Sequence, residues 1–343
     1  MRNVTPDRVV GLLALVLAVT APFYVSAYWV GVLLTQMLFL GIVAASLIFL
    51  SAYGGMVSLA QVSIYGIAGF VLGNATTNGN TKGLNLGWSP WWGVVVGILF
   101  AVGAGLLFGA LASRSVGIYF LMITLTYSVI ANLVFGQVTD ISGFGGISGI
   151  PSPHGIGPVD SHQNRLYYVA LVVAFAVYVL LRYIARTPFG LTLQGVRDDP
   201  VRMSSLGYNV VLHRTIAFAF ASFIAAIGGV LFVWWNGHID PASIDLGATI
   251  DILVIAVIGG LYRLEGAWVG ALFFVIINNY TQQIGFIAER FHSLIGAIFL
   301  VIVLVSPGGL IGLWERAVTF FSGRRRGPSD RTPIEVGRAE PSV

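Results

Sequence analysis

The sequence predicts an all-α integral membrane protein with about ten transmembrane helices, some broken or re-entrant, and with both termini in the cytoplasm. Composition is the first observation: 57% of the 343 residues are hydrophobic and 9% are charged, with a mean hydropathy of +0.87. So few polar side chains do not cover a water-soluble globule of this size. The second is a series of apolar segments near the length of about 20 residues that a helix needs to cross a bilayer. The third is the concentration of basic residues on one side of those segments.

Glycine, proline and charged residues divide the chain into ten apolar segments. Their expected bounds are 9–29, 30–50, 53–73, 91–112, 117–137, 166–185, 215–235, 249–261, 266–288 and 291–313. Segment 53–73 contains Gly, Ser and Gln residues and segment 249–261 is short, so either is a candidate for a broken or re-entrant helix. We expect residues 1–322 to form one polytopic membrane domain and the polar residues 323–343 to form a disordered cytoplasmic tail.

The first apolar segment has a second interpretation, as a cleaved signal peptide. Arg2 and Arg8 precede it, and Val25-Ser26-Ala27 resembles a small-residue cleavage site. The run is longer than a normal signal core and leads directly into the next segment, which favours a retained helix.

The distribution of basic residues sets the expected orientation. If Arg2 and Arg8 are cytoplasmic, ten crossings place all but three of the 18 Lys and Arg residues on the cytoplasmic side. The exceptions are Lys82, Arg165 and Arg290. Removing one internal crossing would put the long basic loop and the basic tail on opposite sides, so the asymmetry favours an even number. It also explains the pI near 9.4 without a nucleic-acid partner.

The inventory of reactive residues indicates a protein that is not an enzyme and that holds no cofactor or metal. The absence of cysteine excludes disulfides and thiolate metal ligands. The single lysine, Lys82, is not preceded by glycine at the spacing of a phosphate-binding loop, so the chain has no Walker motif. The histidines lack the i, i+4 pairing and the nearby carboxylates of a metal site or a catalytic triad. They are His154, His162, His213, His238 and His292.

The loop 186–214, between two long apolar segments, carries the strongest local signal for function. Asp199 is a favourable N-cap, Pro200 suits the first helical position, and Gly207 can take the left-handed conformation that ends a helix. We therefore expect a helix of about two turns on the cytoplasmic side.

This expected helix combines apolar contact area with charge, as is typical of a surface that docks into a cleft on another protein. The residues expected to make that contact are Arg197, Asp198, Asp199, Arg202, Met203, Leu206 and Gly207. The alternative is an interfacial helix held by anionic lipid headgroups. The two adjacent aspartates argue against it, because an acidic leaflet repels them.

Polar side chains inside the apolar segments form a second group of candidates. An unpartnered polar group in hydrocarbon is costly, so such residues usually face the protein interior or a water-filled cavity. The candidates for a polar path are Ser58, Gln61, Asn132, Asp251 and Asn278. The alternative is hydrogen bonding between helices. Asp251 has a further alternative, as a favourable charge at the start of a helix.

Three glycine pairs predict close packing between helices. They are Gly69 with Gly73, Gly105 with Gly109, and Gly266 with Gly270. Small residues at this spacing let helix backbones approach closely in lipid, so the pairs indicate architecture rather than cargo.

Motifs along nearly the whole chain combine into one pattern. In and after the long loop they are Thr187-Pro188-Phe189-Gly190, Val196-Arg197-Asp198-Asp199, Leu206-Gly207-Tyr208-Asn209-Val210, Ala217-Phe218-Ala219-Phe220 and Gly228-Gly229. Elsewhere they are Tyr53-Gly54-Gly55 with Ser58-Leu59 and Gly66, Arg114 with Gly117-Ile118-Tyr119-Phe120 and Met122-Ile123-Thr124-Leu125, Ser142-Gly143 with Ser148-Gly149-Ile150-Pro151, and Val257-Ile258-Gly259-Gly260-Leu261. Together they resemble the LivM-type permease subunits of branched-chain amino-acid ABC importers.

The resemblance implies a non-catalytic permease subunit in a bacterial plasma (inner) membrane. It implies as partners a LivH-like permease, two cytoplasmic ABC ATPase subunits, an extracytoplasmic solute-binding protein and membrane lipid. The family's coupling helix carries over to Asp199–Leu206, with Arg197 and Asp198 at its entry. Closure of the ATPases would push on this helix, and the two permease halves would rock between outward and inward openings.

Departures from the family pattern leave the cargo open. Met56 and Ala60 stand where many members have Gln and Gly, Gly145 stands where Asp is common, and Tyr262-Arg263 stand where a Gly and a small residue are usual. The expected cargo is branched-chain or related hydrophobic amino acids, and the alternatives within the family are urea, amides or other small solutes. A different class is an ion-coupled secondary transporter or channel, in which Asp251 or the cluster around Asn278 would bind the coupling ion.

Overall fold

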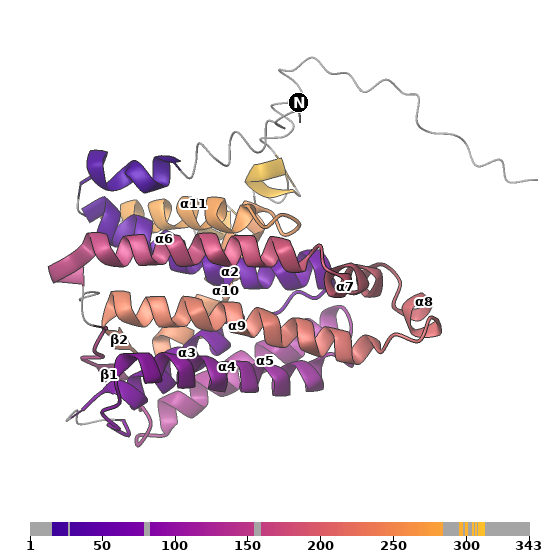
Figure 1. Ribbon diagram of the computed structural model, residues 1–343, viewed down its shortest axis with the longest axis horizontal. Helices are drawn as coiled ribbons and strands as arrows, with labels where there is room; N and C mark the ends of the chain where they lie inside the picture. The colour runs from indigo at the N-terminus through magenta and orange to yellow at the C-terminus, as the bar shows by residue number, and fades with distance from the viewer. Residues whose placement is uncertain are drawn as a thin grey trace, which may run out of the picture.

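The helices of this protein run side by side along its longest axis (Figure 1). The structure is a computed structural model that describes residues 16–26, 28–78, 83–153, 159–283, 295–297, 299–300, 304, 306 and 308–312. Helix α8 (Pro200–Ser205) lies at one end of the bundle, and the strands β1 (Ile147–Ser148) and β2 (His238–Ile239) lie at the other (Figure 1). We call these the α8 end and the sheet end.

The remaining elements are almost all α-helices. They are η1 (Trp29–Leu34), α2 (Thr35–Gly54), α3 (Gln61–Thr76), α4 (Pro90–Ala112), α5 (Ile118–Gln137), α6 (Val159–Ile184), α7 (Pro188–Asp198), α9 (Val210–Asn236), η2 (Pro241–Ile244), α10 (Leu246–Gly259) and α11 (Gly266–Gln283). Residues 16–24 are also helical.

Five helices in the described part of the chain are long and apolar enough to cross a membrane. They are Trp29–Gly54, Pro90–Ala112, Ile118–Gln137, Arg165–Ile184 and Val210–Asn236. The predicted all-α, multi-pass class is confirmed to this extent. The number of ten crossings and the cytoplasmic termini stay predictions. Parts of segments 9–29, 266–288 and 291–313, and all of the tail 323–343, lie outside the described residues.

The weak segment 53–73 is broken, as the sequence allows. Helix α2 ends at Gly54 because Gly55 takes a left-handed conformation, with φ +66°. The next helix, α3, begins at Gln61, eight residues later than the predicted start of that segment. The other weak segment forms α10, whose 14 residues span about 21 Å, less than the hydrocarbon core of about 30 Å.

The helix Trp29–Gly54 begins as a π-helix, η1, over its first six residues. The amide of Thr35 donates to the carbonyl of Val30, five residues earlier. The carbonyl of Gly31 accepts a hydrogen bond of 2.8 Å from the indole Nε1 of Trp235 on α9. This bond joins the two most buried membrane helices near the sheet end.

Helices α2 and α9 form the centre of the bundle, and small residues bring the neighbouring helices close to them. A Cβ added at Gly229 of α9 would collide with the carbonyl oxygen of Tyr65 on α3. A Cβ at Gly97 of α4 would lie 2.8 Å from the carbonyl oxygen of Ala68. The three predicted glycine pairs also sit at close contacts. The residues nearest to an added Cβ are Ile239 and Ile150 for the first pair, Ser222 and Phe218 for the second, and Gly259 and Ile255 for the third.

Helices α4, α5 and α6 lie at the periphery. Within their most apolar windows, 22% to 28% of the residues are buried, against 72% in α9. Their exposed faces carry large apolar side chains, among them Leu99, Phe100, Val129 and Leu133. Such faces suit contact with lipid or with another membrane subunit.

Candidate functional site

The loop 186–214 folds into two consecutive helices, α7 and α8, at one end of the bundle (Figure 1). The sequence predicted the second but missed the first. Helix α7 has the same start signal as α8, because Thr187 caps it with a side chain that accepts from Gly190 N and Pro188 occupies its first turn. Reading that Thr-Pro pair as a cap would have predicted α7 as well.

Helix α8 matches the predicted capped helix. The Asp199 carboxylate accepts a hydrogen bond of 2.9 Å from the backbone amide of Arg202, which is the N-cap interaction. Leu206 is the C-cap, and Gly207 follows with a φ of +91°. The turn at Gly207 reverses the chain toward α9.

Most of the predicted contact residues on α8 face solvent. No residue of this helix is buried, and Val201 and Leu206 are 74% and 65% exposed. Arg202 is exposed as well, whereas Met203 is half-buried and lies against Gly195 of α7. The structure therefore divides the predicted group into an outward set and one residue that packs α8 onto α7.

Helix α7 attaches this segment to the bundle. Its residues Leu193 and Val196 are fully buried, and Gly190 lies against the backbone of Ile184 and Ala185. Arg197 was predicted as a contact for another protein, but its guanidinium is already engaged within the chain. Its Nη1 donates to the carbonyl oxygen of Ala52 at the end of α2, and its Nε lies 2.8 Å from Oδ1 of Asp198.

The break between α2 and α3 lies beside this attachment. Met56, Ser58, Leu59 and Ala60 are all buried. Ser58 Oγ accepts from the amide of Ala60 at 3.2 Å, and the amide of Leu59 donates to Thr124 Oγ1 on α5 at 3.1 Å. Polar backbone groups inside a bundle need such partners, since no water replaces them.

The five candidate path residues lie at different places in the bundle. Ser58 and Gln61 are buried at the break, where Gln61 Oε1 accepts a bond of 3.1 Å from Ser46 on α2. Its Nε2 is buried without a partner among the described residues. Asn132 is at the sheet end, where its amide donates to the carbonyl oxygen of Pro241 at 2.7 Å. Asn132 thus makes a hydrogen bond between two elements of the chain, which is the alternative to a role in a polar path.

The last two candidates lie on the late helices. Asp251 is the sixth residue of α10, and the N-cap is Asp245, whose carboxylate accepts from Ala248 N at 2.7 Å. The alternative of Asp251 as a helix-start charge is therefore wrong, because the helix begins three residues before the predicted segment. Asn278 is half-buried on α11. Whether these residues line a path stays a prediction.

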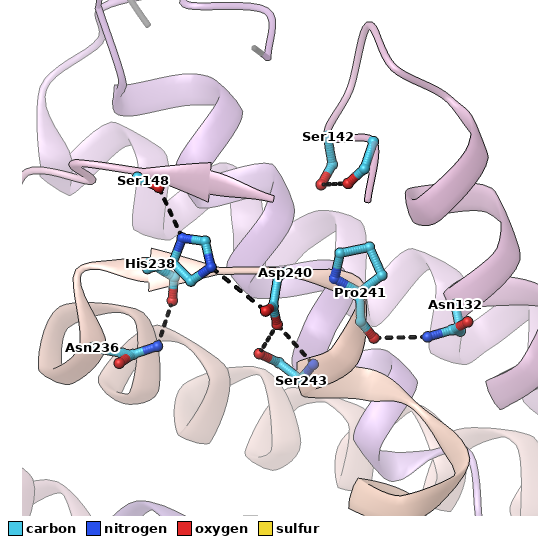
Figure 2. Close-up of polar contacts among 9 residues, drawn as sticks. Asn132, Ser142, Ser148, Asn236, His238, Asp240, Pro241 and Ser243 are labelled. Carbon is cyan, nitrogen blue, oxygen red and sulfur yellow. Dashed lines mark hydrogen bonds and ion pairs between the residues drawn. The ribbon is translucent and has the colours of Figure 1, made fainter. Parts of the chain in front are cut away.

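A polar network at the sheet end was not predicted from the sequence (Figure 2). The strands β1 and β2 pair antiparallel, with Ser148 opposite His238. Ser148 Oγ lies 2.9 Å from His238 Nδ1, and His238 Nε2 lies 3.6 Å from Asp240 Oδ2. The other oxygen of Asp240 accepts a bond of 2.6 Å from the Ser243 hydroxyl, so the network joins the loop after α5 to the loop after α9.

Comparison with known proteins places this arrangement in a family. A family model described as "Branched-chain amino acid transport system / permease component" matches residues 30–304. The chain belongs to this family. The predicted resemblance to LivM-type permeases is thereby confirmed, and the protein is a non-catalytic permease component.

Curated relatives of this permease cover most of its length. The high-affinity branched-chain amino acid transport system permease proteins LivM of Salmonella typhimurium and Escherichia coli are each 24% identical over 91% of the chain and 77% of their own length. A probable LivM permease protein of Methanocaldococcus jannaschii is 26% identical over 76% of the chain and 81% of its own length. No solved structure matches the chain.

The described part of the permease offers no metal site. Within those residues, no group of three or more His, Asp and Glu side chains gathers closely enough to hold an ion. His238 binds within the sheet-end network, and His213 lies 2.9 Å from the carbonyl oxygen of Asn209 at the start of α9. The positions of the other three histidines lie outside the residues whose side chains the structure describes.

Proposed function

We propose that this permease is the membrane-spanning subunit of an ATP-driven importer of branched-chain or related hydrophobic amino acids in a bacterial plasma membrane. It would pair with a LivH-like permease, two cytoplasmic ATPase subunits and an extracytoplasmic solute-binding protein. The cargo is the one in the names of its LivM relatives. The observation that carries the coupling role is the exposed, capped helix α8 at the end of the bundle.

Helix α8 has the surface expected of a docking element for the ATPases. Its two most exposed apolar side chains, Val201 and Leu206, would insert into a cleft on the ATPase, with Arg202 at the edge. Asp198 and Asp199 place negative charge at the entry of the helix, which disfavours an anionic lipid surface as the partner. The buried face of α7 would pass a force on α8 into the bundle, because Leu193 and Val196 are fully buried and protein interiors are close-packed.

The proposed orientation places the α8 end in the cytoplasm and the sheet end outside. The asymmetry of Lys and Arg across the ten predicted crossings supports this orientation, which also places both termini in the cytoplasm. A solute-binding protein would then approach the sheet end, where β1 and β2 join two loops. The candidate path residues Ser58, Gln61, Asn132, Asp251 and Asn278 would contact solute on its way between the two ends.

The docking role is tested by exchanging the exposed apolar residues of α8 for charged ones. In the complete complex, Val201→Asp and Leu206→Asp should each reduce co-purification of the ATPase subunits at least tenfold, since a buried unpaired charge at an interface costs about 2 kcal/mol or more. A matched control is Val116→Asp, because Val116 is 57% exposed near the same end but lies between α4 and α5. Unchanged co-purification with both α8 variants would refute the docking role.

The class of transporter is tested with the purified chain in liposomes. We expect no amino-acid flux until the partner subunits and ATP are supplied. Flux that an ion gradient drives, with no ATPase present, would instead support the ion-coupled class. The cargo follows from thermal-shift measurements of the cognate solute-binding protein with branched-chain amino acids, urea and short amides.

A further inference from the structure

The break between α2 and α3 is held by side chains from two other helices, α7 and α5. Four of its residues, from Met56 to Ala60, are buried, so its backbone groups depend on protein partners. One partner, Arg197, comes from the helix that carries α8. The other, Thr124, comes from the peripheral helix α5. The break is thus in contact with both the docking segment and a membrane helix.

The contact with Arg197 satisfies a carbonyl that the end of α2 leaves open. In a continued helix the amide of Met56 would bond to the carbonyl of Ala52. It donates instead to Leu50 O, at 3.0 Å, and the amide of Gly55 donates to Ser51 O, at 3.2 Å. The Arg197 guanidinium supplies the missing donor to the carbonyl of Ala52. Asp198 Oδ1 lies 2.7 Å from Nη2 of the same guanidinium and orients it. A cation at the last carbonyls of a helix is favourable.

The stem of Arg197 also packs against the break. A Cβ added at Gly55 would lie 2.6 Å from Arg197 Cγ, and one at Gly54 would lie 3.8 Å from Leu193. Leu193 and Arg197 are four residues apart and therefore project from the same face of α7. Helix α7 accordingly contacts the end of α2 over a full turn, so displacing α7 displaces the start of the break.

The contact with Thr124 lies at the other end of the break. The Thr124 hydroxyl donates to Leu121 O in its own helix, at 2.9 Å, and is left free to accept the bond of 3.1 Å from Leu59 N. Thr124 is fully buried, about 9 Å along α5 from its first residue. On the same face of α5, Ser128 and Asn132 bond to Thr249 and to Pro241 O.

We propose that the break Gly55–Ala60 is a relay that passes movement of the α7–α8 segment to helix α5, with Arg197 and Thr124 as positioning residues at its two ends. This inference rests on the proposed function, because it assumes that ATPases move α8. Helix α5 is suited to respond. Most of it is exposed, and its narrow inner face combines the buried rings of Phe120 and Phe135 with the hydrogen bonds of Thr124, Ser128 and Asn132. Those hydrogen bonds can break and re-form in a second arrangement, and only a narrow apolar face has to shift with them.

The relay is tested by measuring how far α5 moves when the complete complex binds ATP. The chain has no cysteine, so paired spin labels can be placed at Gln137→Cys, on the last residue of α5, and at Val95→Cys, on α4, whose glycines pack closely against α3 and α9. We expect an ATP-dependent change in this distance. Thr124→Val, which has the same shape but lacks the hydroxyl, and Arg197→Met should each reduce the fraction of complexes that show it about fivefold.

Matched controls separate the relay from general damage. Thr126→Val removes a hydroxyl that bonds only to Met122 O in its own exposed turn, and Arg186→Met removes an exposed charge beside α7. Both should leave the change in distance intact. Thr124→Ser keeps the hydroxyl and should restore it. The double variant Arg197→Met with Thr124→Val should be no worse than either single variant, because the two residues act in series.

Two outcomes would overturn the relay, and they differ in what they say about the docking role. If Thr124→Val behaves like Thr126→Val while the distance still changes with ATP, the relay is wrong and the proposed function stands. If no ATP-dependent change occurs in the chain with native Arg197 and Thr124, the relay is wrong. In that case, co-purification of the ATPases with the α8 variants decides whether the docking role falls as well.

Discussion

Helices α9 and α5 both have the length and composition of membrane spans, yet they are held in the bundle by different means. The most apolar window of α9 is 72% buried, and Gly228 and Gly229 bring its backbone against Phe39 and Tyr65. The corresponding window of α5 is only 28% buried. Its inner face combines a few apolar contacts, such as Phe135 stacked on Phe70, with hydrogen bonds that involve Thr124, Ser128 and Asn132 on three successive turns.

The difference teaches which helix can move. Contacts between backbone and glycine are lost only when two helices separate, and such separation opens voids in a close-packed interior. Hydrogen bonds between single side chains contribute about 1 kcal/mol each and can be exchanged for other partners. The centre of this bundle is closely packed around α2 and α9, whereas α5 contacts it over a narrow face. The bundle can therefore change shape at α5 while the centre stays packed.

The largest expected effect comes from forcing apart α3 and α9, which pack closely at the centre of the bundle. Gly229→Ala would place a methyl group against the carbonyl of Tyr65 and force α3 away from α9. We expect a loss of about 1–3 kcal/mol of stability, the range for overpacked cores. The measurement is the thermal unfolding midpoint of the purified protein in detergent.

Gly103→Ala on α4 is the matched control, because an added Cβ there meets nothing within 4 Å. It should leave the unfolding midpoint unchanged or raise it slightly, since Ala favours a helix over Gly by about 1 kcal/mol. Equal losses at Gly103 and Gly229 would show that the close contact with Tyr65 is not what makes Gly229 necessary.

The next effect concerns the break between α2 and α3, where α7 packs against Gly55. Gly55→Ala and Gly207→Ala both put a side chain on a left-handed residue, with φ values of +66° and +91°, at a cost of about 1–2 kcal/mol. Only at Gly55 does the new methyl also meet Arg197, whereas Gly207 has nothing within 4 Å. We expect Gly55→Ala to lower the unfolding midpoint more. A greater effect at Gly207 would contradict the close packing of α7 on the break.

A smaller effect is expected from removing one hydrogen bond between α5 and η2. Asn132→Ala removes the donor to the carbonyl of Pro241 and should cost about 1 kcal/mol. Because the bond is local to α5 and η2, amide hydrogen exchange should accelerate in the second half of α5 and stay unchanged in α9. Thr126→Val, on the exposed face of the same helix, is the control. Equal acceleration in α9 would mean that the two helices open together.

The smallest effect is expected at the sheet end. His238→Ala removes the contacts with Ser148 and Asp240, but His238 and Asp240 are each about one-third exposed and lie 3.6 Å apart. Partly exposed pairs of this kind contribute about 0.5 kcal/mol or less. We expect faster proteolysis in the loop around Ser148 and an unchanged unfolding midpoint. His213→Ala, at the opposite end, should leave that loop as it is.

The sequence predicted features that depend on neighbours along the chain. Asp199, Pro200 and Gly207 define α8 through cap and turn preferences, and the Gly, Ser and Gln residues of segment 53–73 indicated a broken helix. The family motifs predicted the permease class for the same reason, because each is a short continuous run. Even α7 carried a local start signal at Thr187 and Pro188.

Contacts between distant residues were beyond such reasoning. Arg197 and Ala52 are 145 residues apart, and Leu59 and Thr124 are 65 apart, so no local pattern pairs them. Arg197 looks in the sequence like any charged residue of a cytoplasmic loop. The strands β1 and β2 hold two residues each, too short for an alternating pattern, and they pair only because the loops after α5 and α9 meet in the folded chain.

The π-helical geometry of η1 affects where the helix Trp29–Gly54 tolerates the loss of a residue. A π-helical turn accommodates one residue more than an α-helical turn, and here the surplus is absorbed between Trp29 and Leu34. Deleting a single residue from this stretch would let it tighten into an ordinary α-helix while every side chain from Thr35 onward keeps its angular position around α2. The same deletion made in the middle of α2 would rotate half of its buried face by about 100° away from α9.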